Sequence, residues 1–334
     1  MIKLIENEIL KMLSKKKLLL ISGILLILIS LFAYGENHSY KNTINRYTRI
    51  TGQTQNYDWK SLVNQQISDL KSRLNSPYIR DNNRTSTSIQ IEQLQYYLNH
   101  NMNPITPSSA KFTIKFMQQA VILFLPLLAI VLAGDNVSGE FSSKTIKVLL
   151  TKAVPRWKIL LSKYIALLIM TSIVVLETVI ISIIVSTLMF HTGGWAEPVA
   201  TGFRVVSGKL DASNVIKAYE WQYAILVYGL GWFAINTVTT VSFMVSILVR
   251  NTSTSIGIMM ASLIGGEFLQ YFLADWPIVK YFFVINLNLP KYLTGSFQPI
   301  EGMNLTFSVL VLCVWSILAL VVSFKVFNTQ DVLV

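Results

Sequence analysis

The sequence offers few side chains that could carry out catalysis or hold a metal ion. Its three histidines, His38, His100 and His191, lie far apart, and Cys313 is its single cysteine. One cysteine excludes both an intrachain disulfide and a cysteine metal cluster. The chain has no HExxH pair, no GxSxG turn and no GxxxxGKS/T loop, the patterns that hold zinc, a nucleophilic serine and nucleotide phosphates. We therefore predict that the chain is not an enzyme and binds no cofactor or metal of its own.

A basic insert, residues 134–163, separates two strongly apolar stretches. Its basic side chains are Lys144, Lys147, Lys152, Arg156, Lys158 and Lys163, and its acidic ones are Asp135 and Glu140. Aliphatic side chains recur at roughly helical spacing within it, at Ile146, Leu149, Leu150 and Val154. A short amphipathic helix between two membrane spans suits a surface that receives force from a soluble partner.

One acidic residue lies near the middle of an apolar segment. Glu177 falls within 164–190, where a charged carboxylate is costly unless it is protonated, paired or turned toward a polar cavity. Candidate partners in the next apolar segment are Asn236, Thr237 and Thr240. Glu177 would either contact a polar or cationic substrate group, or couple a proton, or form one structural hydrogen bond between helices. The sequence leaves these alternatives open.

A later apolar segment, 255–273, carries small residues at a regular spacing. Gly257, Ala261 and Gly265 recur every four residues, and this pattern lets two helix backbones approach closely in lipid. It predicts a tight helix contact, either within one subunit or between two. Glu267 follows at the expected outer end of the same segment, where water is easier to reach, so its claim to a transport role is weaker than that of Glu177.

The composition predicts an integral membrane protein that must position these residues. Of the residues, 52% are hydrophobic and only 13% are charged, which is too apolar for an ordinary soluble domain. The net charge of +11 would also suit a nucleic-acid-binding protein, but the basic residues gather where apolar segments end. That placement is typical of membrane orientation signals, so we expect contact with membrane lipid and no nucleic acid.

The apolar segments predict an all-α fold with six transmembrane helices. A spanning helix needs about 20 mainly apolar residues, because the hydrocarbon core is about 30 Å thick and each residue rises about 1.5 Å. The segments that meet or approach this length are 18–34, 116–133, 164–190, 223–249, 255–273 and 307–327. Of these, 255–273 is the weakest, since it carries Glu267 and three glycines.

Charge predicts the orientation of these spans. Lysines precede the first one, at Lys3, Lys11, Lys15, Lys16 and Lys17, so its amino end should be cytoplasmic. Six crossings then place both termini and residues 134–163 on the cytoplasmic side. The apolar stripe Ile2, Ile5, Ile9 and Met12 predicts an amphipathic helix over 1–13 that lies on the inner leaflet. A frayed leader, or a signal peptide with 18–32 as its apolar core, is the alternative.

The chain divides into three parts. Residues 1–34 hold the interfacial helix and the first span, 35–111 form a polar extracellular cap, and 112–334 hold five further spans. Within the cap, apolar periodicity predicts helices over 59–74 and 88–99. Residues 268–289 predict a re-entrant or interfacial helical hairpin, and the glycines of 191–222 predict a loop with at most a short helix.

Residues 140–163 resemble the ABC-2 type permeases, the membrane subunits of a class of ATP-binding-cassette transporters. The family pattern has an acidic residue, then threonine before an aliphatic run, a proline and arginine turn, and a basic start of the next span. Here these are Glu140, Thr145, 146–150, Pro155 with Arg156, and 159–163. Lys144 stands where glycine commonly precedes that threonine, and the proline directly precedes the arginine. The order of spans and the enlarged first outer loop extend the resemblance across nearly the whole chain.

The resemblance implies an exporter subunit in a bacterial cell membrane. Two permease subunits, identical or related, would each dock a separate cytoplasmic ATPase, which binds ATP and Mg. Residues 139–154 would form the coupling helix. The residues implied at the coupling site are Glu140, Lys144, Thr145, Ile146, Leu149, Leu150 and Arg156. The cargo would be an amphipathic or hydrophobic molecule, such as an antimicrobial peptide, an antibiotic or a lipid-linked molecule.

A function without ATP is the alternative. Glu177 would also suit an ion-coupled carrier, and the polar cap would suit a membrane peptide sensor or immunity protein. Two roles of the cap stay open: it would touch substrate, or it would pack against a second copy of the chain.

Overall fold

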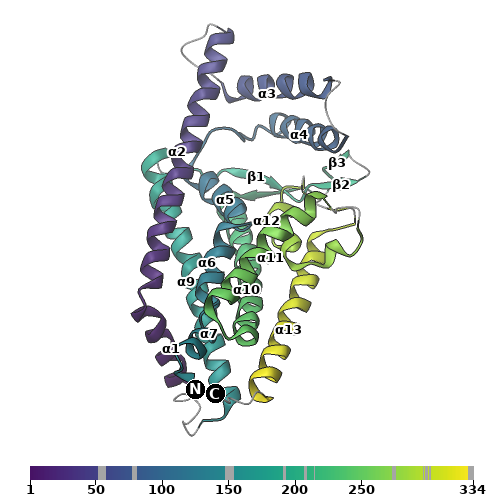
Figure 1. Ribbon diagram of the computed structural model, residues 1–334. Helices are drawn as coiled ribbons and strands as arrows, with labels where there is room; N and C mark the ends of the chain where they lie inside the picture. Colours follow the sequence, from purple (N-terminus) through teal and green to yellow (C-terminus); the bar gives the residue numbers. More distant parts are fainter. Residues whose placement is uncertain are drawn as a thin grey trace.

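A computed structural model describes residues 1–51, 58–76, 81–146, 154–190, 193–206, 209–213, 215–272, 276–295, 297, 300 and 302–329. Most of these residues are helical (Figure 1). Long helices fill one end of the molecule. Two shorter helices and two small sheets lie at the other end, around the far part of α2.

The chain begins with two helices that are separated by a left-handed residue. Helix α1 spans Ile2–Ser14 and α2 spans Lys17–Thr51. Lys16 has a φ of 54°, which an α-helix cannot continue through, so the chain changes direction there. The helix predicted over 1–13 is confirmed. The helix does not end with the predicted span at residue 34, because α2 runs on as one helix to Thr51. Its 35 residues correspond to about 52 Å, well beyond the hydrocarbon core of about 30 Å.

The second apolar segment is a bent pair of helices. Helix α5 spans Ser109–Ala120, α6 spans Phe124–Ala133, and their axes differ by 58°. Pro126 lies in the first turn of α6. A proline ring collides with the carbonyl four residues earlier and supplies no N–H, so a continuous helix through Ile122 would be broken here. The five-residue helix α7, Ser138–Ser142, follows at the same end of the molecule as α1 (Figure 1).

Helix α10, Glu220–Val249, is the centre of the bundle. It packs against α6, α9 (Arg156–Phe190), α11 (Thr252–Phe272) and α13 (Leu305–Thr329). Several of its hydroxyl side chains are buried, and they are satisfied within the helix. Thr239 donates to the carbonyl of Ile235 at 2.9 Å, and Thr240 donates to that of Asn236 at 2.7 Å. Such back-bonding lets hydroxyl side chains occupy an apolar core, although the buried Ser242 hydroxyl of the same helix has no hydrogen-bond partner among the described residues.

The other end of the molecule carries the expected helices and an unexpected set of strands. Helix α3 spans Trp59–Leu74 as predicted, while α4 begins earlier than predicted and spans Asp81–Asn99. They share an apolar core that includes Val63, Ile67 and Leu94. The prediction of a loop over 191–222 is wrong, because β1 (Pro198–Thr201) pairs with β4 (Ile216–Tyr219) and β2 (Arg204–Val206) pairs with β3 (Lys209–Asp211), both antiparallel.

The segment after α11 also differs from its prediction. Instead of a helical hairpin over 268–289, the described residues form two 3-10 turns, η1 (Val279–Tyr281) and η2 (Phe283–Asn286), followed by the short helix α12 (Leu289–Tyr292). Val279 and residues 283–285 are buried in the protein, as irregular backbone near lipid requires, whereas Trp276, Ile278 and Tyr281 are exposed.

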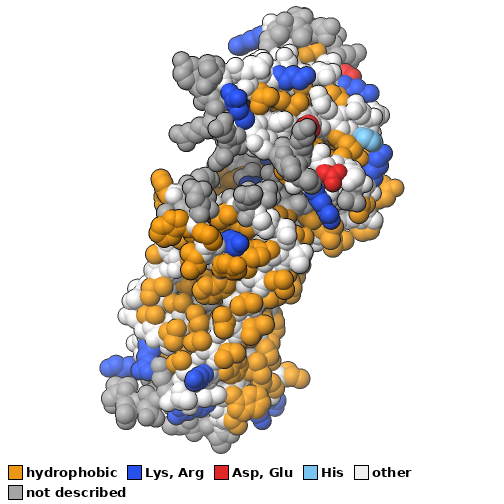
Figure 2. Space-filling model, turned by 90° about the vertical axis from the view of Figure 1, so that its right-hand side faces the viewer, with side chains coloured by type: hydrophobic (Ala, Val, Ile, Leu, Met, Phe, Trp, Pro, Cys, Tyr) orange, Lys and Arg blue, Asp and Glu red, His pale blue; other side chains and the backbone are white. Residues whose placement is uncertain are grey.

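The structure has the features of a membrane protein. In the described part of the chain, α2, α9, α10 and α13 are long and apolar enough to cross a membrane, and the bent pair α5 and α6 makes a fifth candidate if it is one span. On the face that Figure 2 shows, hydrophobic side chains cover most of the half formed by these helices, and most charged side chains lie toward the two ends. This face is therefore apolar where a bilayer would surround it.

Candidate functional site

The basic insert contains a tight turn at the end of α7. The N–H of Lys144 bonds to the carbonyl of Phe141 at 3.1 Å, and the N–H of Thr145 bonds to that of Glu140 at 3.0 Å. This pair of bonds is the Schellman motif, whose central residue is left-handed and usually glycine. Lys144 occupies that position with a φ of 58°. Lys144 stands where the ABC-2 pattern commonly has glycine, and its backbone is left-handed in this chain.

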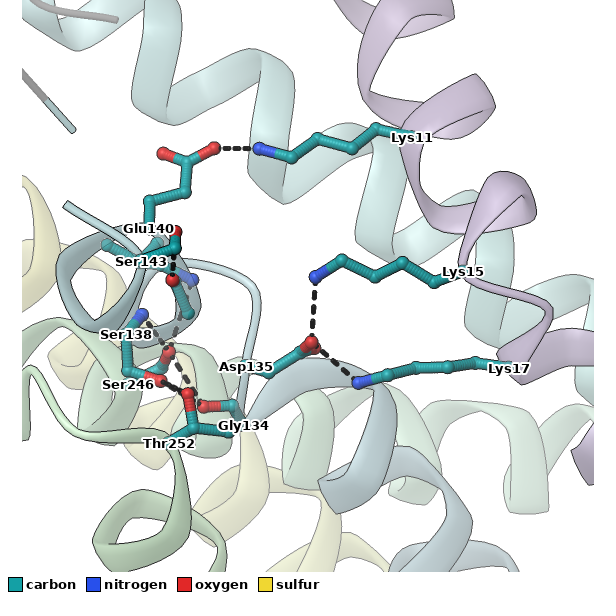
Figure 3. Close-up of polar contacts among 12 residues, drawn as sticks. Lys11, Lys15, Lys17, Gly134, Asp135, Ser138, Glu140, Ser143, Ser246 and Thr252 are labelled. Atoms are coloured by element: carbon teal, nitrogen blue, oxygen red, sulfur yellow. Dashed lines mark hydrogen bonds and ion pairs between the residues drawn. The ribbon is translucent and has the colours of Figure 1, made fainter. Parts of the chain in front are cut away.

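A serine from α10 caps the other end of α7. Val137 precedes α7 and has no side chain that could cap it. The fully buried Ser246 hydroxyl accepts from the N–H groups of Ser138 at 2.9 Å and Val137 at 3.2 Å, and it donates to the carbonyl of Gly134 at 3.0 Å (Figure 3). The turn is therefore fixed to the central helix of the bundle by hydrogen bonds at its start.

Glu140 lies at the centre of a buried ion cluster. Its Oε1 atom is 2.7 Å from Nζ of Lys163, whose side chain is completely buried. The same carboxylate oxygen also pairs with Lys11 of α1 (Figure 3). Lys163 reaches Glu8 of α1 as well, at 2.9 Å. The four side chains tie α1, α7 and the first turns of α9 together. A buried ion pair is retained only when geometry and hydrogen bonds offset the loss of hydration.

The cluster keeps Glu140 ionised. Burial raises the pKa of its carboxyl group, but the charges and hydrogen bonds of Lys163 and Lys11 together lower it further, so the net pKa lies below the ordinary value of 4.5. The carboxylate therefore remains charged at neutral pH and holds both lysines.

A second ion cluster lies beside the first. Oδ2 of Asp135 is 2.9 Å from Nζ of Lys15 and 2.6 Å from Nζ of Lys17 (Figure 3). The lysines that were predicted to mark the cytoplasmic side thus also fasten the junction of α1 and α2 to the start of the insert. A displacement of the turn must carry α1 with it or break these pairs.

The structure divides the residues implied at the coupling site. Lys144 and Thr145 are exposed, whereas Glu140 and Ile146 are buried, with exposed fractions of 4% and 2%. Arg156 begins α9. Leu149 and Leu150 lie outside the described residues. A docking partner would therefore meet the exposed residues of the turn, while Glu140 and Ile146 connect the turn to the bundle.

Glu177 has a different partner from those predicted. Its Oε2 atom accepts a hydrogen bond from the Ser22 hydroxyl of α2 at 2.9 Å. Asn236 instead accepts from Thr171 at 3.0 Å. The Glu177 contact joins α2 to α9, which corresponds to the structural alternative for this residue.

The remaining polar residues of α10 also form contacts between helices. Thr240 lies 3.0 Å from the Tyr164 hydroxyl of α9, and Thr237 accepts from Ser316 of α13 at 3.3 Å. Together with Asn236 they form a ladder of polar contacts along the central helix, away from Glu177.

The small residues of α11 do not pack within the described chain. Gly257 and Ala261 are exposed, and a Cβ added at Gly257 or Gly265 would meet no atom within 4 Å. Of the two predicted alternatives, a contact between subunits is the one that this face leaves open. Glu267 is half-buried in the same helix.

Sequence reasoning missed the residues that complete the Glu140 cluster. Glu8 and Lys11 were assigned to an interfacial helix, and Lys163 to the basic start of a span. Glu8 and Lys11 are three positions apart, and nothing in this spacing shows that α1 folds back onto α9. Among the residues that the structure describes, no group of three or more His, Cys, Asp or Glu side chains could hold a metal ion.

Comparisons with known proteins give the chain's relatives. A family model described as "Protein of unknown function (DUF2705)" matches residues 82–333. "Uncharacterized protein YhcI" of Bacillus subtilis (strain 168) is 27% identical over 339 residues, which cover 99% of each chain. "Uncharacterized membrane protein YdbK" of the same organism is 27% identical over 214 residues, which cover 63% of this chain and 78% of that protein. The similarity to a membrane protein agrees with the apolar helices.

Proposed function

The chain belongs to the family of proteins of unknown function DUF2705, and from this starting point we propose that it is the membrane subunit of an ATP-driven exporter. Its partners are a cytoplasmic ATP-binding-cassette ATPase, which holds ATP and Mg, and a second permease subunit. The cargo is an amphipathic or hydrophobic molecule. The resemblance of residues 140–163 to ABC-2 permeases and the geometry of the turn together support this proposal.

The observation that carries the proposal is the cluster of Glu140, Lys163, Glu8 and Lys11. It connects an exposed turn to two long elements, because Glu140 lies in α7, Lys163 in α9, and the other two residues in α1. A partner that pushes on Lys144 and Thr145 would therefore move α1 and α9 as well. Mechanical coupling of this kind is what a membrane subunit without its own nucleotide site requires.

Six crossings and cytoplasmic termini are part of the proposal. Helix α1 and the end of α13 lie at the same end of the molecule (Figure 1). An even number of crossings is needed for that arrangement, so α11 is counted as the sixth span beside α2, the bent pair, α9, α10 and α13. Lysines concentrate at this end, and positive charge favours the cytoplasmic side. The polar part with α3 and α4 then lies outside a bacterial plasma membrane.

The ion-coupled carrier is the less favoured alternative. It rests on Glu177, whose carboxylate accepts a hydrogen bond from Ser22 between two helices. A peptide sensor or immunity protein would use the outer part in place of the turn, and it would need no ATPase.

Co-purification tests the proposal directly. We would express the full chain with an ATPase encoded beside it, isolate the chain from detergent extracts and measure bound ATPase. Lys144→Glu, an exposed change in the turn, should reduce the amount of bound ATPase several-fold. Lys325→Glu is the matched control, since it places the same charge change on an exposed residue of α13 toward the same end. If neither wild type nor control retains an ATPase, the exporter proposal is wrong.

A further inference from the structure

A cavity lies where the long helices meet the outer part of the molecule. It has a volume of about 180 Å³ and is lined by residues from α2, α4, α5, β1 and the start of α10, among them Glu36, Tyr97, Phe112, Lys115 and Glu220. These come from widely separated parts of the sequence, so the cavity is a product of the tertiary fold. None of its residues belongs to the ion clusters at the α7 turn.

Glu220 is a buried carboxylate in this cavity without a partner. Its side chain is only 4% exposed. Within the described part of the chain, its carboxylate makes no ion pair and accepts no hydrogen bond, and its backbone N–H alone bonds to Glu197. The amino end of α10 offsets part of the cost of this burial. A buried carboxylate without an ion-pair partner is unfavourable unless a counter-charge arrives or the carboxyl group takes up a proton.

The two lysines of the cavity are already neutralised. Lys111 is 2.7 Å from Glu197 and also donates to the carbonyl of Asn103 at 2.8 Å. Lys115 donates to both carboxylate oxygens of Glu36 at 2.7 Å. Each lysine is thus paired with one carboxylate, and among the described residues Glu220 is the carboxylate of this cavity that is left without an ion pair.

The other groups around the carboxylate suit a cationic ligand. Burial and the charge of Glu220 raise the pKa of Tyr97 to about 12, so its phenol stays neutral and can exchange hydrogen bonds. The rings of Tyr97 and Phe112 line the cavity, and the faces of aromatic rings attract ammonium groups.

An apolar groove continues from this cavity. It has a volume of about 470 Å³ and is lined mainly by Leu31, Phe32, Phe112 and Phe116 of α2 and α5. Glu36, Phe112 and Lys115 line both spaces. The Glu36–Lys115 pair therefore lies at the junction between a polar cavity with one uncompensated negative charge and a groove that could hold an aliphatic or aromatic tail.

We propose that this double cavity binds a cationic amphiphile, with its ammonium group beside Glu220 and its apolar tail in the groove between α2 and α5. The site deepens the exporter proposal, because its role in transport rests on that proposal. Its ligand-binding role does not, since binding to the isolated full-length chain needs neither ATP nor the ATPase. The ammonium group could come from a soluble amphiphile or from an aminophospholipid headgroup, and the experiment distinguishes these sources.

Dansylcadaverine is a suitable probe, since it joins an aliphatic ammonium to a fluorescent apolar group. Its Kd would be measured by fluorescence with the full chain in a neutral maltoside detergent, and dansylamide, which lacks the ammonium, would serve as the reference ligand. Glu220→Gln should weaken dansylcadaverine binding about tenfold or more, because a charge-assisted hydrogen bond is lost. Glu6→Gln, the same charge change on exposed α1 at the far end, should leave the Kd unchanged.

The exposed pair at the junction supplies a second test that does not depend on the buried residue. Lys115→Gln leaves Glu36 uncompensated and should strengthen binding, whereas Glu36→Gln leaves Lys115 uncompensated and should weaken it. A purely structural role of the pair would change the Kd of both variants in the same direction. Equal Kd values for wild type and Glu220→Gln, or shifts of the same sign in both junction variants, would overturn the proposal.

Competition identifies the source of the ammonium group. Octylamine should displace dansylcadaverine, and its failure to do so also contradicts the site. Displacement by added phosphatidylethanolamine, and not by phosphatidylcholine, assigns the site to a lipid headgroup, while resistance to both lipids assigns it to a soluble amphiphile. If the wild-type chain retains the ATPase but does not bind dansylcadaverine, this site alone is rejected. Probe binding without any ATPase would reject only the exporter.

Discussion

Lys163 Nζ lies 2.7 Å from Glu140 Oε1, although the lysine side chain is fully buried in the first turns of a membrane-length helix. The pair joins the short helix at the start of the basic insert to the span that follows it. Because Glu8 and Lys11 complete the cluster from α1, the position of the turn, the position of the span and the position of the amino-terminal helix depend on one another.

Removing one member of this pair should destabilise the protein strongly. Lys163→Met leaves the Glu140 carboxylate buried without its main partner, and breaking a buried pair costs about 3–5 kcal/mol. The double variant Lys163→Met/Glu140→Gln should lose less than the sum of the single losses, since it removes both charges. Unfolding by sodium dodecyl sulfate in mixed maltoside micelles would measure the free energies.

The exposed Glu36–Lys115 pair provides the control for that cycle. Its side chains are 32% and 54% exposed, so Lys115→Met should cost about 1 kcal/mol or less. Equal losses for the buried and the exposed lysine would contradict a structural role of the cluster.

The stability of the protein should fall in acid through Glu140. Its pKa in the folded protein lies below the ordinary value of 4.5. A carboxyl group with a lowered folded pKa contributes stability that is complete above its unfolded pKa and is lost as the pH falls through its folded pKa. Unfolding curves from pH 6 downward should therefore show a loss that begins near pH 4.5 and that is smaller in Glu140→Gln. An identical acid profile in this variant would show that the ion cluster does not contribute.

Glycine should replace Lys144 without loss of stability. The left-handed φ of 58° is strained by about 1–2 kcal/mol for a residue with a Cβ and is free of this strain in glycine. Lys144→Gly should therefore keep or slightly raise the free energy of unfolding, whereas Lys144→Val should lower it by about 1 kcal/mol or more, because a β-branched residue fits the left-handed region poorly. Greater stability of the valine variant would show that the turn does not have this geometry.

The contact between Ser22 and Glu177 should be structural. In Glu177→Gln the side-chain amide oxygen can still accept the hydrogen bond from Ser22, so expression and transport should remain near wild type. Ser22→Ala removes the donor and should cost about 1 kcal/mol, the net contribution of an ordinary hydrogen bond, because this contact is only partly buried. Normal folding with loss of transport in Glu177→Gln would instead assign this carboxylate to the transport path.

The sequence predicted the helices whose apolar residues repeat regularly. Helix α3 and α1 were located within a residue or two because one face of each is apolar. The extension of α2 past residue 34 was missed because its residues there are mostly polar, and Tyr40, Ile44 and Tyr47 alone mark an apolar face too weakly. The strands were missed because each has only three or four residues, too few for an alternating pattern to stand out.

The site was predictable only in part. The sequence showed that Lys144 stands where the ABC-2 pattern commonly has glycine, but no backbone conformation was predicted there, and the structure has a left-handed residue at this position. The partners of Glu140 and Glu177 could not be found from spacing, since Lys11 is 129 positions from Glu140 and Ser22 is 155 positions from Glu177. Such contacts depend on how helices pack, and a single sequence contains no direct record of that packing.

Two neighbouring glycines of α11 should differ in how substitution by alanine affects the stability of the chain. A Cβ at Gly266 would lie 2.5 Å from Cβ of Val284, whereas one at Gly265 would meet nothing within 4 Å. Gly266→Ala should therefore destabilise the single chain by overpacking, by about 1–3 kcal/mol, and Gly265→Ala should leave its stability unchanged. If two subunits associate through the exposed face of Gly257, Ala261 and Gly265, then Gly265→Leu should weaken the dimer without unfolding the chain, because a large side chain prevents the close approach that small residues allow. Crosslinking yield and size-exclusion mass measurements of wild type, Gly265→Ala and Gly265→Leu would separate the two effects. An unchanged dimer in Gly265→Leu would mean that the subunits associate elsewhere, and that this face of α11 contacts lipid.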